Sequence, residues 1–138
     1  MARKPAPPRI TIAADLLDHL EALASGAMTR QPDLADRLLT ELARARIVQP
    51  AQMPADVVSI GNRVTYRDES NGREQVVTLV FPEDANIDAG RVSVMTPIGV
   101  ALLGLQAGAR FSWETRGGEM RDLTVVSVAP ADAGGDAA

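Results

Sequence analysis

The chain has 138 residues, 46% of them hydrophobic, and a net charge of −4, which is sufficient for one globular domain and a small additional unit. It contains no cysteine and no apolar run of the roughly eighteen residues that a transmembrane helix needs, so disulfides, thiolate chemistry and a membrane span are excluded. Residues 1–50 hold seven basic and six acidic side chains, whereas residues 51–138 hold seven and twelve. Because an acidic unit repels phosphate backbones, we do not expect direct DNA binding as the main activity, although this balance is compatible with a local basic patch. The absence of cysteine and of a membrane-spanning run predicts a soluble cytoplasmic protein.

The N-terminal residues predict an arm followed by a helix. Residues 1–9 are rich in proline and basic side chains and lack the apolar core of a signal peptide, so a flexible arm is expected. The apolar run at residues 10–12 either docks as a strand or leads directly into a helix. Residues 13–24 carry leucines at helical spacing with acidic residues between them, which is typical of an amphipathic helix.

A second helix is predicted from Pro32 to about Ile47, because proline suits the first helical turn and leucines again share one face. Arg44 and Arg46 would lie in its last turn, where they complement the negative end of the helix dipole. Two amphipathic helices joined by a short link indicate an antiparallel hairpin. The first predicted unit is therefore residues 1–50, a helical hairpin (a short coiled coil) with its flexible arm.

Pro50 and Pro54 mark a boundary, after which the hydrophobic period changes from helical to strand-like. The second predicted unit is residues 51–138, which ends in a disordered tail from Pro130. Five strands with mostly hairpin connections are predicted in it, over residues 57–67, 74–81, 91–95, 109–115 and 120–128. Together with one short helix they give an α+β fold with a mostly antiparallel sheet.

The segment at residues 93–108 joins the third predicted strand to the short helix through a sharp corner. Thr96 is a candidate helix N-cap because its hydroxyl can accept a hydrogen bond from the first turn, and Pro97 suits the first helical position. Such a short helix is not stable alone and must lie on the sheet. We expect the corner at Thr96 and Pro97 to be exposed. Three apolar side chains of the helix divide between core and rim, namely Ile98, Ala101 and Leu102.

Candidate catalytic and metal-binding residues are sparse. His19 is the single histidine, and no serine or cysteine is placed for it to activate, so an exposed helix residue is predicted. The densest acidic groups fall in turns, where aspartate is common for its backbone hydrogen bonds; they are Asp68 with Glu69 and Asp84 with Asp88. The aromatic residues are expected in core or half-buried sheet positions, and they are Tyr66, Phe81, Phe111 and Trp113. The sequence therefore predicts a binding protein, with no enzymatic activity, cofactor or metal site.

Several motifs resemble one family of bacterial proteins. The segment at residues 93–108, a strand that runs into Thr-Pro and then an Ala-Leu-Leu-Gly helix, resembles the C-terminal domain of the Gre transcript-cleavage factors. The sequence of this segment is more similar to that of a related family, the Rnk proteins or regulators of nucleoside diphosphate kinase. The resemblance extends over residues 10–128, and its other specific motifs are Met53-Pro54-Ala55-Asp56-Val57-Val58 and Thr78-Leu79-Val80-Phe81-Pro82.

The resemblance implies an FKBP-like C-terminal domain, an N-terminal antiparallel coiled coil and binding to bacterial RNA polymerase near its secondary channel. DNA or RNA would be contacted only through that complex. In Gre factors the C-terminal domain docks on the polymerase, and the matching positions here are Met95, Thr96 and Pro97, although Gre factors often carry an acidic residue where Met95 stands. Gre factors also hold two carboxylates at the coiled-coil tip that position a catalytic magnesium ion, whereas residues 25–31 have none. The resemblance thus implies a transcription regulator without transcript cleavage.

Two other functions are compatible with these features. An FKBP-like fold could catalyse prolyl isomerisation, but such sites are apolar pockets walled by aromatic residues, and this chain spreads its four aromatic residues over separate predicted strands. The second alternative is direct regulation of a nucleoside diphosphate kinase by binding. An indirect effect on that kinase through transcription is equally compatible.

Overall fold

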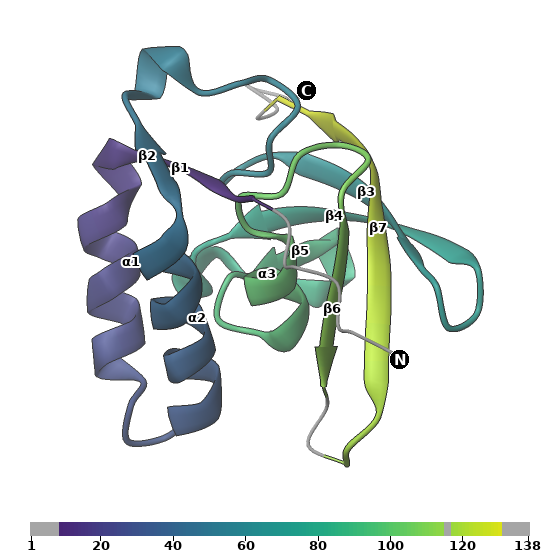
Figure 1. The fold of residues 1–138 in the computed structure, drawn as a ribbon, viewed down its shortest axis with the longest axis horizontal. Helices are drawn as coiled ribbons and strands as arrows, with labels where there is room; N and C mark the ends of the chain where they lie inside the picture. Colours follow the sequence, from purple (N-terminus) through teal and green to yellow (C-terminus); the bar gives the residue numbers. More distant parts are fainter. Residues whose placement is uncertain (1–8, 115–116, 131–138) are drawn as a thin grey trace, which may run out of the picture.

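The computed structural model describes residues 9–114 and 117–130 and shows an α+β protein arranged in layers (Figure 1). Two helices, α1 (Ala14–Gly26) and α2 (Pro32–Arg44), form a hairpin on one side, and a five-stranded sheet forms the other. The short helix α3 (Pro97–Leu102) lies between them (Figure 1). This confirms the predicted fold class. In the described part of the chain, no helix has the length and apolar character needed to cross a membrane.

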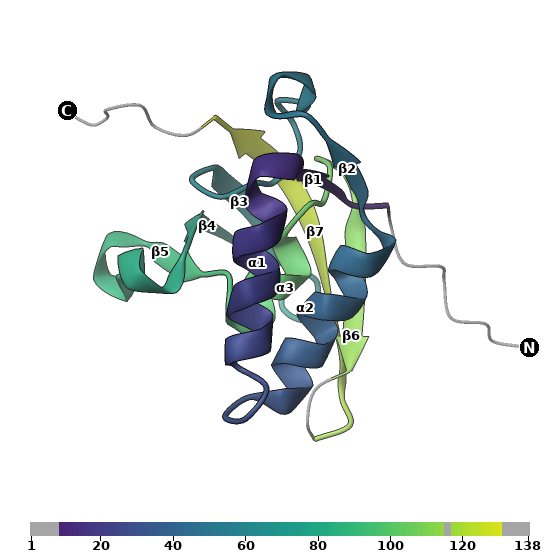
Figure 2. The same ribbon diagram turned by 90° about the vertical axis from the view of Figure 1, so that its left-hand side faces the viewer.

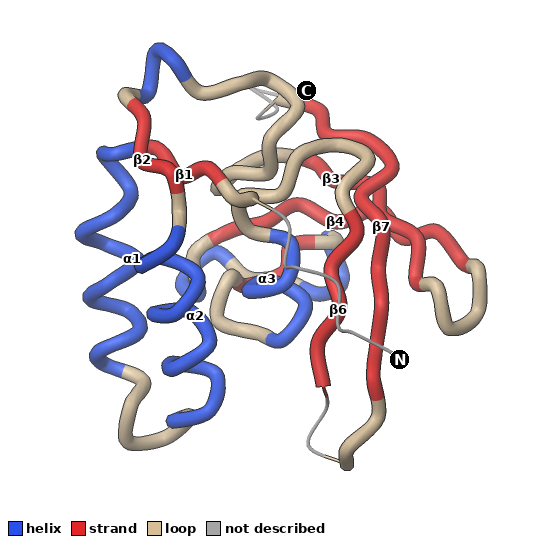
Figure 3. Tube along the Cα trace, in the orientation of Figure 1, coloured by secondary structure: helices blue, strands red, loops and turns tan. Residues whose placement is uncertain are grey.

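The five strands follow the order β5-β4-β3-β7-β6 (Figure 3). The pairs β3–β4, β3–β7 and β6–β7 are antiparallel, whereas β4 and β5 are parallel. The chain passes through two short 3-10 turns between β4 and β5, so it re-enters the sheet in the same direction. The predicted antiparallel sheet is therefore mixed at this edge. The strands are β3 (Arg63–Asp68), β4 (Arg73–Val80), β5 (Arg91–Ser93), β6 (Arg110–Glu114) and β7 (Met120–Ala129).

The helical hairpin is closed at its base by two short parallel strands, β1 (Thr11–Ala13) and β2 (Arg46–Val48). The apolar run before α1 is therefore a strand. The prediction that the second helix runs to Ile47 is wrong, because α2 ends at Arg44 and Ala45 is extended, with φ −70° and ψ 147°. Ile47 and the valine after it are β-branched and suit a strand better than a helix. Arg46 consequently lies in β2.

The first strand of the sheet is shorter than predicted, because β3 begins at Arg63 and not at Val57. A turn precedes β3, in which the Asn62 side chain accepts from the Ser59 N–H at 2.7 Å. Val57 forms an isolated antiparallel bridge with Gln106 instead. This bridge ties the start of the C-terminal half to the segment that follows α3.

One contiguous hydrophobic core runs from the hairpin through α3 to the sheet. Helix α3 contacts α2 on one side and strands β5 and β6 on the other. The helical hairpin is therefore seated on the sheet by its apolar stripes, and its two helices lie alongside the sheet (Figures 1 and 2). The core includes Leu20, Leu38 and Leu42 from the hairpin, Leu102 from α3, and Val64, Leu79, Phe111 and Leu123 from the sheet.

Gly104 lies where the base of the hairpin meets the segment after α3. Its φ of +82° is in the left-handed region, and a Cβ added there would lie 2.7 Å from the Cβ of Ile10 and 3.2 Å from the Thr11 nitrogen. The Gly104 carbonyl accepts from the Thr11 N–H at 3.1 Å, and the Gly104 N–H donates to the Val58 carbonyl at 2.9 Å. The missing side chain therefore allows β1 to pack directly on this segment.

We expect Gly104→Ala to destabilise the protein, because the new methyl group overlaps the root of the Ile10 side chain and the backbone is strained at positive φ. The free energy of unfolding, measured by urea denaturation, should fall by about 1–3 kcal/mol, as at other overpacked sites. Gly26→Ala is the matched control, because nothing lies within 4 Å of a Cβ at this position in α1, and alanine favours a helix. Equal losses in both variants would contradict the close approach at Gly104.

Candidate functional site

The corner between β5 and α3 is held by short hydrogen bonds. Ser93 Oγ accepts from the Met95 N–H at 2.9 Å, and the Thr96 hydroxyl donates to the Ser93 carbonyl at 2.7 Å. Thr96 Oγ1 also accepts from the Gly99 N–H at 3.0 Å, so Thr96 is the N-cap of α3, with Pro97 at the start of the helix. The predicted cap is therefore confirmed. Because the Thr96 hydroxyl bonds both the strand and the helix, it fixes the angle between them.

Gly99 brings the first turn of α3 directly onto the end of β5. A Cβ at this position would collide with the Ser93 carbonyl oxygen and would lie 2.7 Å from the Val94 Cα. Val94 is fully buried, and its N–H donates to the Val80 carbonyl at 2.8 Å. The corner is thus rigid, because backbone packs on backbone without an intervening side chain that could rearrange.

The corner presents a small uncharged surface. Pro97 is exposed, Met95, Thr96 and Ile98 are half-buried, and Leu102 is fully buried. Pro97 is therefore exposed as expected, whereas Thr96 is exposed only in part. The apolar residues of α3 also divide as expected, with Ile98 at the rim and Ala101 and Leu102 in the core. None of these side chains is an acid or a base, so the surface offers packing and hydrogen-bond contacts to a partner and no proton-transfer chemistry.

The tip of the helical hairpin, residues 27–31, contains neutral and basic residues only. The Gln31 N–H donates to the Ala27 carbonyl at 2.8 Å, which closes the turn before α2. Met28 is 45% exposed, and Arg30 is also exposed. The tip lies at the same end of the molecule as the end of β6 and the start of β7 (Figures 1 and 2). A magnesium ion would find no carboxylate ligand in this turn.

The other candidate residues do not form a reactive site. His19 is exposed, as predicted, and its ring stacks on Phe81 with the ring centroids 4.0 Å apart, so it joins α1 to the end of β4. The Asp68 carboxylate accepts from both the backbone and the hydroxyl of Ser70, which is a local turn contact. In the described part of the chain, no group of three or more His, Cys, Asp or Glu residues could hold a metal ion.

The aromatic residues follow the prediction where their side chains are described. Tyr66 and Phe111 are buried, and Phe81 is half-buried. The side chain of Trp113 lies outside the described residues. The three described rings are therefore used for packing in the core and against α1, and these three do not gather into a stacking platform.

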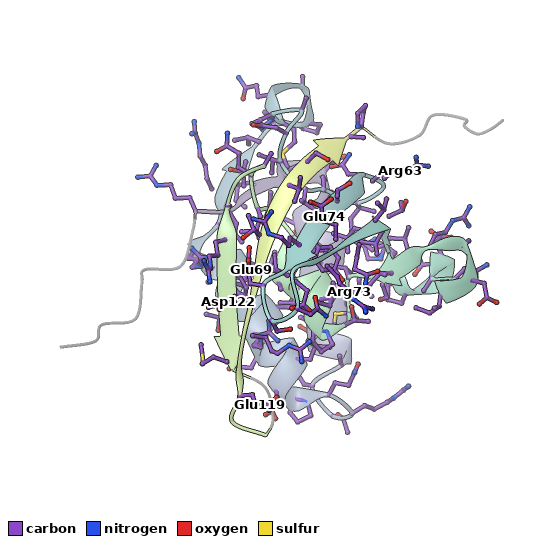
Figure 4. The ribbon with its side chains drawn as sticks, turned by 90° about the vertical axis from the view of Figure 1, so that its right-hand side faces the viewer. Arg63, Glu69, Arg73, Glu74, Glu119 and Asp122 are labelled. Carbon is purple, nitrogen blue, oxygen red and sulfur yellow. The ribbon has the colours of Figure 1, made fainter. Side chains whose placement is uncertain are left out.

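The sheet face turned away from the helices carries a network of charged residues (Figure 4). Arg110 on β6 pairs with Asp122 on β7 at 2.7 Å, and Arg67 on β3 pairs with Glu69 at 3.2 Å. Glu69 also accepts from the Thr124 hydroxyl at 2.5 Å. Sequence reasoning missed this network, because its members come from three strands and a turn whose alignment depends on the strand register.

These contacts lower the pKa values of both carboxyl groups. The pKa of Glu69 lies below its ordinary 4.5, mainly because the Thr124 hydroxyl and then the Arg67 guanidinium stabilise the ionised form. The pKa of Asp122 lies below its ordinary 3.8 because of hydrogen bonds from Ser112 and Arg110. Both carboxylates are thus kept ionised and paired, which suits a structural role and not proton transfer near neutral pH.

Two family descriptions together match most of the chain. "Rnk N-terminus" matches residues 8–48, and "Transcription elongation factor, GreA/GreB, C-term" matches residues 53–130. The "Regulator of nucleoside diphosphate kinase" of Escherichia coli (strain K12) is 37% identical over 118 residues, which are 82% of this chain and 87% of that protein. The "Transcription elongation factor GreA" of Bacillus cereus is 32% identical over 130 residues, which are 91% of this chain and 82% of that protein.

A solved structure has the same fold. The "Prokaryotic transcription elongation factor GreA/GreB from Nitrosomonas europaea" superposes with a TM-score of 0.69 at 34% identity, covering 89% of this chain and 99% of that one. Fold and sequence thus define a protein of the GreA/GreB type. The chain belongs to the Rnk family, in which an Rnk N-terminal part precedes a GreA/GreB C-terminal domain.

Acidification should destabilise the protein through the charged network on the sheet. Because the folded-state pKa values of Glu69 and Asp122 are lowered, their stabilisation is present above the ordinary values of 4.5 and 3.8 and is lost as the pH falls through the folded values. We expect the melting temperature to fall between about pH 5 and pH 3. The fall should be shallower in a Glu69→Gln, Asp122→Asn double variant.

Glu83→Gln is the control for this measurement, because Glu83 is exposed and its side chain has no hydrogen-bond or ion-pair partner among the described residues. Its melting curve should follow that of the unchanged protein at every pH. If the double variant also followed that curve, the network would not be the origin of the pH dependence.

Proposed function

We propose that this protein is a non-enzymatic, cytoplasmic regulator of transcription that binds bacterial RNA polymerase near its secondary channel. Its C-terminal domain docks through the corner at Met95, Thr96 and Pro97. Membership of the Rnk family supports the partner, since the C-terminal family match carries the description of a transcription elongation factor. We choose this surface because the corner between β5 and α3 is rigid and partly apolar.

A rigid corner suits protein binding for a thermodynamic reason. Association removes conformational freedom from loops and side chains, and a surface that is already fixed loses less of it. Here the Thr96 hydroxyl and the side-chain-free contact at Gly99 fix the backbone before the partner arrives. Met95 and Pro97 add apolar area, so this docking should depend weakly on salt.

We also propose that the hairpin does not support transcript cleavage. Residues 25–31 contain no aspartate or glutamate that could help to hold a catalytic magnesium ion. Each helix of the hairpin has 13 residues, which corresponds to a length of about 20 Å at 1.5 Å per residue. The division into a hairpin unit at residues 1–50 and a docking unit at residues 51–138 is part of the same proposal, and the shared core implies that the two units unfold together.

A second candidate function is direct regulation of a nucleoside diphosphate kinase. This function is favoured by the name of the Escherichia coli relative, "Regulator of nucleoside diphosphate kinase". Kinase turnover measured with purified enzyme, with and without this protein, separates direct regulation from an effect through transcription. Prolyl isomerisation has weaker support, because Tyr66 and Phe111 are buried in the core, and two grooves among the described residues have no aromatic lining residue.

Substitution of the corner should weaken polymerase binding more than it weakens the fold. We expect Met95→Lys to reduce the affinity for purified core RNA polymerase by about tenfold or more, because it places a charge in an apolar contact. Met95 is only half-buried and a lysine stem can reach solvent, so the melting temperature should change little. Affinity is measured by fluorescence anisotropy of labelled protein, and stability by thermal unfolding.

Two further variants make this experiment decisive. Met28→Lys introduces the same charge at the exposed hairpin tip and should leave affinity unchanged. Leu102→Asp buries an unpaired charge and should unfold the protein, with loss of binding as a consequence. If Met95→Lys lost stability and affinity in parallel, as Leu102→Asp should, the corner would be structural only. If the unchanged protein showed no binding at micromolar concentration, the proposed partner would be wrong.

A further inference from the structure

A groove lies between the base of the helical hairpin and the C-terminal domain. On the domain side it is bordered by the segment before β3 and by the segment that follows α3. It has a volume of about 520 Å³, within the range of small-molecule sites. Its lining residues come from four separate parts of the chain: residues 9–11, residues 44–46, Pro54 with Val57, and Gly104 with Gln106. A second hollow of about 290 Å³ shares the lining residues Thr11, Arg46 and Pro54 with it, so the two hollows are neighbours.

The groove gathers three arginines in a chain that is acidic overall. Arg9, Arg44 and Arg46 line it, and among the described residues the one carboxylate bonded to a lining residue of the facing wall is that of Asp56, which accepts from Gln106. Arg44 is held by Glu41, at 2.6 Å and 2.9 Å from its Nη2 and Nε atoms to one carboxylate oxygen. Within the described residues, the side chains of Arg9 and Arg46 have neither a hydrogen-bond nor an ion-pair partner. Two guanidinium groups are therefore free to bind an anion, and a third lies beside them.

The walls of the groove are fixed by backbone hydrogen bonds. The Arg46 N–H donates to the Ile10 carbonyl at 2.9 Å, and the Thr11 N–H donates to the Gly104 carbonyl at 3.1 Å. On the opposite wall, the Gln106 side chain donates to the Asp56 carboxylate at 3.0 Å. The arginines thus project from a preformed frame, and a ligand that binds them need not order the backbone first.

From this arrangement we infer that the groove binds a small polyphosphate, that is, two or three linked phosphate groups, either free or carried by a nucleotide. A guanidinium group matches phosphate oxygens with two parallel hydrogen bonds. Free guanidinium groups from two different chain segments favour a ligand with more than one phosphate, and the volume is larger than one phosphate requires. The inference does not depend on polymerase binding.

A ligand at this site would have a structural consequence. Arg9 and Arg46 belong to the base of the hairpin, whereas the facing wall at Pro54 and Gln106 belongs to the C-terminal domain. A bound polyphosphate would therefore bridge the two and hold the hairpin in its seat. Ligand that binds the folded state only should also raise the melting temperature in proportion to the logarithm of its concentration.

The test is calorimetric titration of the purified full chain with inorganic pyrophosphate and with ATP, at about 0.15 M salt to suppress nonspecific attraction. We expect saturable binding of both, weakened by about tenfold or more in Arg9→Gln and in Arg46→Gln. Arg30→Gln at the hairpin tip is the matched control and should bind as the unchanged protein does. Glu41→Gln should tighten binding, because it releases Arg44 from its ion pair.

Four outcomes would overturn the inference. Absence of binding at millimolar ligand removes the site. Equal weakening by Arg30→Gln shows nonspecific attraction, and orthophosphate binding as tightly as pyrophosphate shows that linked phosphates are not recognised. Binding of a single-stranded RNA oligonucleotide that is weakened by Arg9→Gln and Arg46→Gln, without binding of pyrophosphate or ATP, assigns the groove to nucleic acid. Should Arg46→Gln melt at a lower temperature, Arg9→Gln decides, because Arg9 lies outside every helix and strand.

Discussion

The seating of α3 between the hairpin and the sheet is the constraint on which the rest of the structure depends. A helix of six residues is not stable in water by itself, because nucleation costs more than so few hydrogen bonds return. It persists here because Gly99, Val100, Ala101 and Leu102 are buried, and because the missing side chain at Gly99 lets it touch the backbone of β5. The hairpin covers its other side. Helix α3 is therefore stable only in the presence of both the hairpin and the sheet.

Both proposed binding surfaces are consequences of this seating. The docking corner lies at the start of α3, and Gly104 and Gln106 of the groove lie shortly after its end. The helix separates them by about 9 Å at 1.5 Å per residue. Such closeness is not by itself a mechanism of communication, since coupling requires an element with two arrangements that both sites bias. The contacts at Gly99 and Gly104 favour a single arrangement, so we expect the two surfaces to act independently unless the hairpin moves.

The sequence predicts features that depend on neighbouring residues and misses those that depend on distant ones. The corner was predictable because Thr96, Pro97 and the apolar spacing after them act within one turn of helix. The groove was not, because Arg9 and Arg46 meet only through the parallel pairing of β1 with β2. The prediction that Arg46 lies in the last turn of a helix hid its position in the groove. The β-branched side chains of its neighbours Ile47 and Val48 do favour a strand, so this signal was present in the sequence. The stacking of His19 on Phe81 and the charged network of the sheet likewise depend on tertiary placement.

The hairpin has a different physical role here from that of a coiled coil that reaches into another molecule. A projecting coiled coil must bury its apolar stripe within itself, whereas these two helices place Leu20, Leu38 and Leu42 in the core that they share with α3 and the sheet. Lifting the hairpin away would expose that stripe to water, which is costly in proportion to its area. The hairpin is therefore better understood as a wall of the folded domain, with one side of the arginine-lined groove at its base and a tip without carboxylates at its far end.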